Sequence, residues 1–590
     1  MTTTRYIVRL ERVGTHREEA ARFTTRTGAI ADLNLVFESE TVSVATTDAD
    51  PTRLGGHGVI LGALFGRVAM HRVNVLESDE SDRIVASRER LIDEYWGPYV
   101  AIIADPVTHC VDIIRAPLGE LPCYIVHRAD ATIVASDIDL LIRFGYLEPS
   151  VSWGEVRHHL TIRDLRTSRT CLQDLAELPG GQRLTVAAGR VSSGALWSPW
   201  AFKHRDKQLT RIDDAAEAVE SITNSAIAAR AASFDNVVLM LSGGLDSSIV
   251  AAGLARAGSN AAALTLVTRD AIGDERHHAR RVSDRLALPL IEGWRDVSRI
   301  DIARSGALNL PRPTVRLFLQ ESTRLAGELA DQTDAQALFN GGGGDSVFCS
   351  LQSASPAVDR LRNSGVGPAF WRTANDIAEI AQASVPVVIA DVIRRAWLGK
   401  PVFAPFCDTS LLSQDAVPPN VCPEEHPWLT APKGALPGGA AHVRLIAFAQ
   451  SYVEGFDPQA TLPTIAPLLA QPLVETCLRI PSWLWCDGGR NRAVARRAFA
   501  PHLPRETTDR RSKGTPDSFV AEIFETHRAS IREMLADGLL VQHRLVDRDA
   551  ILRTLAHPGC TRGDSFRRIL QFVDVEAWAQ SMVRKRAAAG

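Results

Sequence analysis

Apolar and polar residues alternate in two different ways along the chain. From residue 1 to about residue 200, short apolar runs such as 99–103, 111–114 and 132–135 are separated by turns, which predicts an all-β or α+β sandwich. Further along, strand-like runs alternate with helix-like stretches, which predicts a parallel sheet with helices on both faces and a ligand at its carboxyl edge. Because 590 residues exceed a single core, we predict two domains, residues 1–205 and 206–590.

The strongest local signal lies where a strand-like run meets a helix-like stretch. Residues 237–241 are apolar and of strand type, a Ser-Gly-Gly turn follows at 242–244, and an alanine-rich pattern over 249–257 predicts a helix. Glycines let backbone N–H groups approach a ligand, and those groups together with the helix dipole attract an anion. Asp246 would repel a phosphate unless Mg²⁺ lay between them. The stretch therefore predicts a nucleotide site with Mg²⁺; the alternative is an ordinary turn in which Asp and Ser cap the helix.

A second glycine-rich turn follows another strand-like run. Residues 337–339 are apolar, and Asn340, the four glycines at 341–344 and Asp345 come next. Four glycines beside an acid indicate a backbone that passes close to a ligand. The alternative is a flexible glycine turn without a ligand.

A basic stretch occupies the last quarter of the chain. Eight cations lie between Arg490 and Lys513, with only Glu506 and Asp509 as acids among them. Arg492 is four residues before Arg496, and the two are predicted to share one face of a helix. An unpaired cationic cluster favours a phosphate-rich ligand, whereas a solvated basic helix is the alternative.

Overall composition narrows the class of protein. The chain is 45% hydrophobic and 23% charged with a net charge of −3, so nothing favours a nucleic-acid partner or disorder. No apolar run is long enough to cross a membrane, and the first residues lack a signal-peptide core. The nine cysteines are scattered without a CxxC pair, as expected for reduced thiols. We therefore expect a cytoplasmic enzyme that has no membrane partner.

The two glycine turns resemble those of a known enzyme superfamily. Ser-Gly-Gly-Leu-Asp-Ser-Ser at 242–248 resembles the pyrophosphate loop of enzymes that cleave ATP to AMP and pyrophosphate, and residues 340–346 stand where asparagine synthetases have Ser-Gly-Glu-Gly-x-Asp-Glu. This resemblance implies ATP and Mg²⁺, with Asp246 and Asp345 as metal ligands. Lys513 stands at the lysine of the family's Arg-x-Lys-x-Gly loop, which contacts the reacting carboxyl group and the α-phosphate. We assign Lys513 and Arg496 as candidate catalytic residues, and the implied nucleotide contacts are Leu241, Ser242, Gly243, Gly244, Asp246, Ser247, Asn340 and Gly341.

The first domain resembles the glutaminase domain of the same enzymes, a sandwich of the N-terminal-nucleophile type. The similar segments are 96–99, 115–124, 135–138 and 178–181, in the family's order. The family's catalytic cysteine follows the initiator methionine, and here that residue is Thr2. Threonine can act as an N-terminal nucleophile, but Thr2 is more simply interpreted as part of a frayed terminus. We expect an inactive glutaminase-like domain, so the amine has to come from elsewhere.

The last third of the chain resembles the lasso-peptide cyclases of this superfamily. The resemblance rests on residues 426–443, which it implies face the substrate, and on 467–475 with its Gln471-Pro472 pair; Glu475 is expected to be structural and to pair with an arginine. It implies that an Asp or Glu side chain of a precursor peptide is adenylated and then attacked by the N-terminal amine of that peptide. A leader peptidase and a leader-binding protein would be its partners.

Three alternatives stay open. They are an ammonia-dependent asparagine synthetase, a small-molecule amide synthetase like the β-lactam synthetases, and a degenerate scaffold without activity. Gly342 disfavours the second alternative, because β-lactam synthetases carry a catalytic tyrosine at that place.

Overall fold

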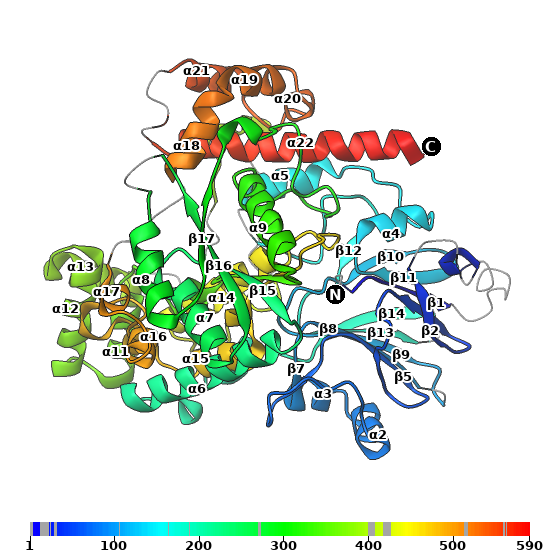
Figure 1. Cartoon of the computed structure of the whole chain (residues 1–590), viewed down its shortest axis with the longest axis horizontal. Coiled ribbons are helices and arrows are strands. Elements are labelled where there is room, and N and C mark those ends of the chain that lie inside the picture. Colours follow the sequence, from blue (N-terminus) through cyan, green and yellow to red (C-terminus); the bar gives the residue numbers. More distant parts are fainter. Residues whose placement is uncertain are drawn as a thin grey trace.

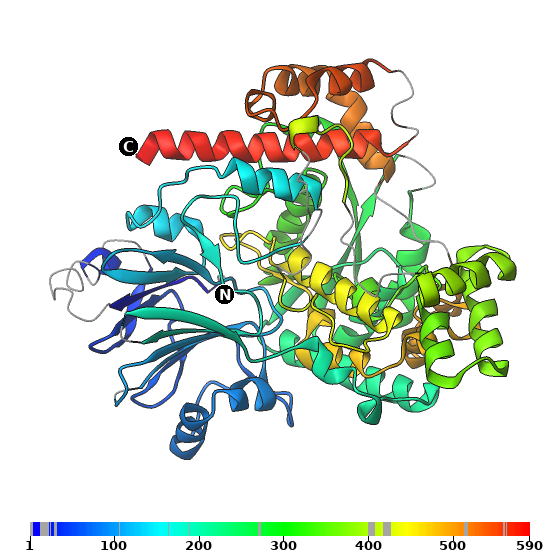
Figure 2. The ribbon, with the colours of Figure 1, turned by 180° about the vertical axis from the view of Figure 1, so that it is seen from behind.

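The computed structural model of this chain has two bodies, one built on antiparallel sheets and the other on a parallel sheet with helices. The residues that the structure describes are 4–11, 23, 25–28, 32–105, 107–162, 165–187, 189–269, 273–314, 316–398, 407–416, 426–511, 517–557, 561 and 563–589. Figure 1 shows the antiparallel body at the right and the parallel sheet near the centre, and Figure 2 shows both from behind. No helix in the described ranges combines the length and the apolar character that a membrane crossing needs.

The antiparallel body consists of two six-stranded sheets. The first contains β1 (Tyr6–Glu11), β2 (Asn34–Glu38), β3 (Val42–Thr46), β10 (Tyr124–His127), β11 (Ala131–Ala135) and β12 (Ala176–Glu177), in the order β12-β10-β11-β1-β3-β2. The second contains β4 (Thr52–Arg53), β5 (Gly58–Gly62), β8 (Tyr99–Ala104), β9 (Val111–Arg115), β13 (Gln182–Ala187) and β14 (Arg190–Ala195), in the order β14-β13-β9-β8-β5-β4. The short strands β6 (Phe65–Gly66) and β7 (Tyr95–Trp96) form a separate antiparallel pair.

The central strands of each sheet are buried on both faces. Along β1, Tyr6 and Val8 point into the core between the sheets, whereas Ile7 joins a second core with helix α4 (Ile138–Arg143). On the other sheet, Ile60 points outward toward helix α3 (Glu89–Glu94). The predicted sandwich is confirmed, and it has helical layers on its outer faces, which strand spacing alone did not predict. The other helices of this half are α2 (Ser78–Ala86) and α5 (Trp153–Thr161).

The second body contains a five-stranded parallel sheet. Its strands are β15 (Asn236–Met240), β16 (Asn260–Val267), β17 (Leu290–Trp294), β18 (Ala337–Phe339) and β19 (Thr464–Ile465), in the order β17-β16-β15-β18-β19. Helix α9 (Leu319–Thr333) packs on one face, and α6 (Ile212–Ala231), α7 (Leu245–Arg256) and α8 (Arg276–Leu286) pack on the other. The predicted parallel sheet with helices on both faces is confirmed.

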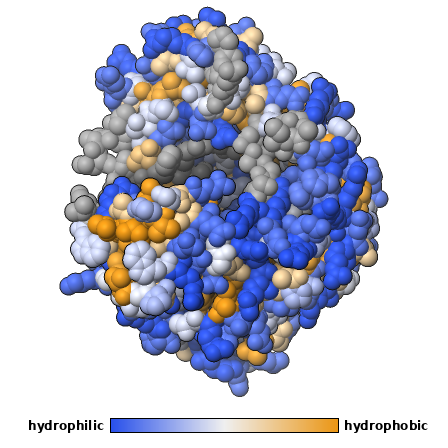
Figure 3. Space-filling model, turned by 90° about the vertical axis from the view of Figure 1, so that its left-hand side faces the viewer, coloured by the Kyte–Doolittle hydropathy of each residue, from blue (hydrophilic) through white to orange (hydrophobic). Residues whose placement is uncertain are grey.

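Further helices surround this sheet. They are α10 (Gly344–Val347), α11 (Ser355–Ser364), α12 (Pro368–Ala381), α13 (Val385–Ile393), α14 (Pro437–Val453), α15 (Gln471–Leu478), α16 (Ala493–Phe499), α17 (Arg505–Asp509), α18 (Asp517–Thr526), α19 (Arg528–Ala536), α20 (Leu539–Gln542), α21 (Arg548–Ala556) and α22 (Ser565–Ala589). Figure 3 shows the side on which α12 and α13 lie; this side is hollowed, and hydrophobic atoms gather beside the hollow. The exposed side chains of Trp371, Val387, Ile393 and Trp397 belong to this helical region. Such a group is typical of a surface that contacts another polypeptide.

The order of the strands places a ligand crevice at one point of the parallel sheet. The chain leaves β15 for β16 and β17 on one side and later returns to β18 on the other side of β15. Neighbouring strands whose connections leave in opposite directions form a topological switch point, and ligands bind at its carboxyl end. The turns after β15 and β18 are the two glycine turns found in the sequence.

The two bodies share hydrophobic cores and a buried ionic cluster. Helix α5 packs with α18 and α22 in one core, so side chains from both predicted domains fill it. The ionic cluster consists of Arg115, Arg166, Arg312, Glu177 and Glu454. Glu177 lies 3.0 Å from Nη1 of Arg115 and 3.1 Å from Nη2 of Arg166, and it also pairs with Arg312. Glu454 lies 2.7 Å from Nη2 of Arg115.

The guanidinium groups determine the ionisation of Glu177. Burial alone would raise the pKa of Glu177, but Arg166, Arg312 and Arg115 outweigh burial and hold that pKa well below its usual value. A carboxyl group with a lowered pKa stabilises the folded state at pH values above its unfolded pKa of about 4, and this stabilisation is lost as the pH falls below that value.

We predict that Glu177→Gln lowers the free energy of unfolding by roughly 3–5 kcal/mol at neutral pH, because it removes the carboxylate that Arg115, Arg166 and Arg312 share and leaves Glu454 as the remaining acid of this buried cluster. Denaturant titrations with circular dichroism would measure the change, and the difference from the wild type should shrink below about pH 4. Glu506→Gln is the matched control: its side chain is 56% exposed and pairs with Arg281 at 3.2 Å, so about 1 kcal/mol or less is expected. Equal stability of Glu177→Gln and the wild type at neutral pH would contradict this account.

Candidate active site

The turn after β15 is built from short hydrogen bonds between its own hydroxyl and backbone groups. Oγ of Ser242 lies 3.2 Å from Oγ of Ser247 and accepts the backbone N–H of Gly244 at 3.3 Å. Oγ of Ser247 accepts the N–H of Ser242 at 3.3 Å. Gly243 has a positive φ of 71° and lies against the backbone of His278, where a Cβ would come within 2.5 Å. The turn therefore has little room for other residues at this point.

Helix α7 begins earlier than the alanine pattern predicted. It starts at Leu245, with Gly244 as its N-cap, so Asp246 and Ser247 lie in its first turn rather than before it. An anion placed before this helix would meet free N–H groups and the positive end of the helix dipole.

The turn after β18 packs directly against that first helical turn. A Cβ on Gly341 would lie 2.6 Å from the backbone nitrogen of Ser247, and one on Gly344 would lie 2.5 Å from Cγ of Asp246. Real Cβ atoms do not approach other atoms so closely, so both positions require glycine while the two turns remain in contact. Oδ1 of Asn340 accepts the N–H of Gly342 at 2.7 Å and closes the second turn.

The two predicted metal ligands converge on one cation. Nη1 of Arg492 lies 3.0 Å from each carboxylate oxygen of Asp246 and 2.7 Å from Oδ1 of Asp345. Asp246 is buried, whereas the side chain of Asp345 is 44% exposed. The point between the two carboxylates therefore already holds a positive charge, and the hard oxygen ligands there suit Mg²⁺.

The remaining ligands of such an ion would come from outside the protein. Within the described part of the chain, no group of three or more His, Cys, Asp and Glu side chains is arranged to hold a metal ion. Two carboxylates leave coordination positions for nucleotide phosphates and water, which is how Mg²⁺ is usually bound with a nucleotide.

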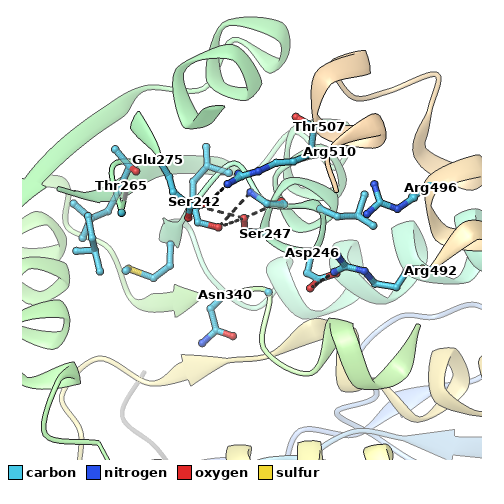
Figure 4. Close-up of a pocket in the computed structure, with 18 of the residues that line it drawn as sticks. Ser242, Asp246, Ser247, Thr265, Glu275, Asn340, Arg492, Arg496, Thr507 and Arg510 are labelled. Carbon is cyan, nitrogen blue, oxygen red and sulfur yellow. Dashed lines mark hydrogen bonds and ion pairs between the residues drawn. The ribbon is translucent and has the colours of Figure 1, made fainter. Parts of the chain in front are cut away.

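A cavity of about 330 Å³ lies beside the two turns, as Figure 4 shows. All but one of the predicted nucleotide contacts line it, namely Leu241, Ser242, Gly244, Asp246, Ser247, Asn340 and Gly341; Gly243 lies behind them against α8. Apolar side chains of Met240, Leu264 and Leu266 form part of the wall. Hydroxyl and backbone donors on one side and an apolar wall on the other suit a phosphate group and a flat base.

Arg496 lines the same cavity, but its hydrogen bonds go to the protein. Its guanidinium donates to the carbonyl oxygen of Asn491 at 2.8 Å, to the side-chain oxygen of Asn491 at 2.9 Å and to the carbonyl oxygen of Thr508 at 2.6 Å. Burial, with smaller contributions from Arg492 and Arg490, lowers the pKa of Arg496 to about 10. In this state Arg496 joins the segments before α16 and at the end of α17, and so shapes the cavity wall.

Two predictions about the basic stretch are wrong. Arg492 precedes α16 in a left-handed conformation with φ of 56°, so it does not share a helical face with Arg496. The stretch is also not an unpaired cluster. Arg492, Arg496 and Arg510 line the cavity, whereas Arg490 and Arg505 pair with Asp509, Arg497 pairs with Asp213, and Arg511 pairs with Glu379. Distant acids on α6 and α12 neutralise cations that the local sequence leaves unmatched.

The structure shows a further ion pair at the cavity, between Arg510 and Glu275. Nη2 of Arg510 donates to Oε1 of Glu275 at 2.7 Å, and both side chains line the cavity. Nε and Nη1 of Arg510 are buried and have no hydrogen-bond partner in the described part of the chain. In the sequence, the one hint of this ion pair is the acidic pair Asp274-Glu275 before α8. Acids are common at the start of a helix even without a ligand, so this hint does not identify a site.

A second cavity of about 680 Å³ lies on the other side of the two turns and shares Asp246 and Gly341 with the first. We call it the chamber. Its lining includes the apolar side chains of Leu165, Leu317, Phe318, Phe448, Val520, Ile523 and Leu570, the second glycine turn with Asp345, and the polar residues His159, Arg166, Arg312, Arg316, Tyr452, Arg567, Gln571 and Asp574. Its volume falls in the range of about 300–1,000 Å³ that is typical of pockets for sizeable organic ligands.

The stretch expected to face the substrate is mainly core. His426 is buried, and its Nδ1 accepts the backbone N–H of Trp428 at 3.1 Å. His442 is also buried and lies 3.0 Å from the carbonyl oxygen of Val347. None of the described residues in 426–443 lines either cavity; farther along α14, Phe448 and Tyr452 reach the chamber, and the ring of Tyr452 lies against Gly342.

The other predicted residues have different outcomes. Glu475 is structural as expected, because Nη2 of Arg67 donates to its Oε1 at 2.9 Å and Nε1 of Trp197 donates to the same oxygen at 2.8 Å. Lys513 and Thr2 lie outside the described residues. The seven cysteines in the described ranges are free thiols, as predicted.

Comparisons with known proteins identify part of the chain. The sequence profile of the asparagine synthase family matches residues 218–396 and 457–580, which is just over half of the chain. A search of curated protein sequences found no match. Among solved structures, an allosteric regulatory enzyme of purine biosynthesis matches with a TM-score of 0.21 and 9% identity, covering 50% of this chain and 75% of its own. A glutamine phosphoribosylpyrophosphate amidotransferase from B. subtilis in complex with ADP and GMP matches with a TM-score of 0.21 and 11% identity. This match covers 57% of the present chain and 90% of the amidotransferase chain. Structural similarity this low supports no argument.

We predict that Gly341→Ala lowers the affinity for ATP–Mg²⁺ by about tenfold or more, equivalent to at least about 1.4 kcal/mol, because the new methyl group forces the two turns apart. Isothermal titration calorimetry would measure the affinity. Gly327→Ala is the matched control: this glycine lies in α9 with no atom within 4 Å of an added Cβ, and affinity should not change. Wild-type affinity in Gly341→Ala would show that the contact between the turns is not needed.

Proposed function

The chain belongs to the asparagine synthase family, and we propose that it uses ATP to join a side-chain carboxylate of a peptide to the N-terminal amine of the same peptide. Membership of this family makes the protein an ATP-dependent, amide-forming ligase. The peptide substrate and the resulting macrolactam are the proposal. The observation that carries it is the chamber of about 680 Å³ that opens directly against the acidic turns.

The first step is activation of the carboxylate. The turn after β15 and the start of α7 hold the β- and γ-phosphates through backbone N–H groups and the hydroxyl groups of Ser242 and Ser247. Bound Mg²⁺ would neutralise the pyrophosphate as it leaves. The peptide carboxylate attacks the α-phosphorus, its oxygen forms the new bond, and pyrophosphate leaves as the acyl adenylate forms.

Arginines around the first cavity supply positive charge near the phosphates. Arg510 has two unpartnered donor atoms and is fixed by Glu275, so it is oriented without being neutralised completely. Arg492 lies at the point where the two acids meet. Lys513 is proposed to stabilise charge as it develops between the carboxylate and the α-phosphate. Arg496 acts through the shape of the wall, because its hydrogen bonds go to Asn491 and Thr508.

The second step is capture of the activated carbonyl carbon by an amine. The chamber lies on the side of the turns away from Ser242, so an acyl group that reaches the α-phosphate extends into it. The chamber is larger than one aspartate requires and has an extensive apolar wall, which supports a peptide substrate. Enclosure by this wall excludes water that would hydrolyse the adenylate.

In this proposal the antiparallel body lines the same chamber and does not catalyse a second reaction. His159, Leu165 and Arg166 reach the chamber from this body. We propose that it produces no ammonia and that a leader peptidase supplies the free N-terminus of the peptide. A leader-binding protein would deliver the precursor, and the exposed apolar side chains on α12 and α13 support a polypeptide contact at that side.

An ammonia-dependent asparagine synthetase is the second candidate. The family profile favours it, because asparagine synthase gives the family its description. Aspartate and ammonium would then provoke pyrophosphate release, and peptides would not. A small-molecule amide synthetase would release pyrophosphate with a free amino acid that carries its own amine.

We predict that a peptide with a free N-terminus and an Asp or Glu side chain provokes pyrophosphate release, whereas aspartate with ammonium does not. An N-acetylated copy of the peptide should still release pyrophosphate but form no macrolactam, because only the nucleophile is blocked. A coupled pyrophosphate assay and mass spectrometry would measure both steps. Release with aspartate and ammonium alone would overturn the peptide proposal.

We also predict that Asp246→Asn and Lys513→Ala lower pyrophosphate release by about a hundredfold or more, because each removes charge that acts on the phosphates. Circular dichroism should show an intact fold. Arg497→Ala is the control from the same basic stretch, since Arg497 pairs with Asp213 and lines neither cavity, and its activity should match the wild type. Full activity in Asp246→Asn would contradict the assignment of this site.

A further inference from the structure

One face of the C-terminal helix α22 forms a wall of the chamber. Arg567, Leu570, Gln571 and Asp574 line the cavity, and their spacing of three, four and seven residues places them on one side of a helix. Asp574 is the acidic residue among these four. Figure 1 shows α22 crossing the molecule above α9 and α5.

Asp574 is a buried carboxyl group with little to neutralise it. Its side chain is 3% exposed, and the backbone N–H of Leu317 donates to its Oδ2 at 3.4 Å. No side chain in the described part of the chain donates a hydrogen bond to it. Buried carboxyl groups in structural roles are usually paired or hydrogen-bonded by side chains, so this one needs another explanation.

A line of contacts connects Asp574 with the glycine turns. Leu317 follows Arg316, whose guanidinium lies 4.5 Å from the ring centroid of Tyr452. The ring of Tyr452 in turn lies against Gly342, two residues after Asn340 in the second turn. The acid and the second glycine turn therefore both face the chamber, with the side chains of Arg316 and Tyr452 between them along the wall.

Among the other charged and titratable groups around the chamber, Arg316 offsets the charge of Asp574 only in part. They are His159 on α5, Arg166 after it, Asp246 on α7, Arg312 and Arg316 before α9, Asp345 on α10, Tyr452 on α14 and Arg567 on α22. Arg166 and Arg312 pair with Glu177, Arg567 pairs with Asp564 at 3.0 Å, and Arg316 donates to the carbonyl oxygens of Tyr452 and Gly455. Burial lowers the pKa of His159 to about 3, so His159 is a poor proton acceptor at neutral pH.

The second step of the proposed reaction requires a proton acceptor in this chamber. An N-terminal amine has a pKa of about 8 and is largely protonated at neutral pH. When it replaces AMP, the C–N bond forms, the C–O bond to AMP breaks with its electron pair leaving on the phosphate, and two protons leave the nitrogen. The first of these protons blocks the lone pair, so it has to leave before attack. Burial raises the pKa of Asp574 to about 8, against smaller lowering effects from the backbone N–H groups of Leu317 and Arg316 and from the charge of Arg316, so its basicity matches that of the amine.

We propose that Asp574 is the general base of amide formation: its carboxylate takes the first proton from the attacking amine, and the second proton leaves on the phosphate of the departing AMP. This inference rests on the proposed function, because it needs an acyl adenylate in the chamber. Local sequence patterns carry no signal for this role, because Asp574 lies within the long helix α22, where an acid is ordinary. The experiment has to separate loss of the base from loss of the fold and from a wrong substrate.

The test compares two nucleophiles on the same acyl adenylate. The proteins are the full-length wild type, Asp574→Asn and Glu576→Gln, and the probe is a synthetic peptide with a free N-terminus and one Asp side chain. Hydroxylamine is a weakly basic nucleophile that is already unprotonated at neutral pH, so it needs no base. ATP–pyrophosphate exchange reports activation, hydroxamate formation reports the adenylate, and mass spectrometry reports the macrolactam.

We predict that Asp574→Asn keeps wild-type exchange and hydroxamate formation while macrolactam formation falls by about 10²- to 10⁴-fold. Glu576→Gln is the matched structural control, because Glu576 is a buried acid on the same helix that accepts the backbone N–H groups of Leu539 and Leu540 and does not line the chamber. Its ratio of macrolactam to hydroxamate should equal that of the wild type, whatever its stability.

Other outcomes overturn specific claims. Wild-type macrolactam formation in Asp574→Asn removes Asp574 as the base. A parallel loss of exchange, hydroxamate and macrolactam in that variant assigns Asp574 a structural role and also overturns the inference. If the wild type shows no exchange with the peptide although aspartate with ammonium supports it, the proposed function fails, and this inference fails with it.

Discussion

The close contact between two glycine turns is the constraint on which the site depends. Gly341 and Gly344 lie so near the first turn of α7 that neither position has space for a Cβ. This contact brings Asp246 and Asp345, which are far apart in the sequence, onto the same nitrogen atom of Arg492. Two carboxylates that contact the same nitrogen atom are close enough to repel each other, and the positive charge between them offsets that repulsion. Arg492 and a divalent ion therefore compete for the same oxygens, so binding of the ion is coupled to the position of the Arg492 side chain.

Much of this arrangement could be predicted from the sequence, because it depends on local patterns. The strand before Ser242, the parallel order of the sheet and the long helix α6 follow from periodicity and turn residues, and the structure has them within a few residues of the expected bounds. The glycine turns could be found because glycine is needed where backbones touch. The start of α7 was placed too late, since apolar periodicity does not register a polar first turn that is helical and serves a ligand.

The partners of the charged side chains could not be predicted in the same way. Whether an arginine is free depends on acids that folding brings from elsewhere, and the basic stretch divides between the cavity and partners such as Asp213 and Glu379. The local sequence could not assign Glu275 a role, because its partner, Arg510, is 235 residues away. Asp574 carried no signal at all, since an acid in an amphipathic helix is ordinary until the structure shows which face is turned inward.

Buried ion pairs tie the antiparallel body to the chamber. Its Glu177 holds Arg166 and Arg312, two cations that reach the chamber wall, and its Arg67 holds Glu475 beneath the site. Removing this body would take these partners from Arg312 and Glu475 and open the chamber on one side, which would admit water to it. This body therefore forms part of the chamber wall through His159, Leu165 and Arg166.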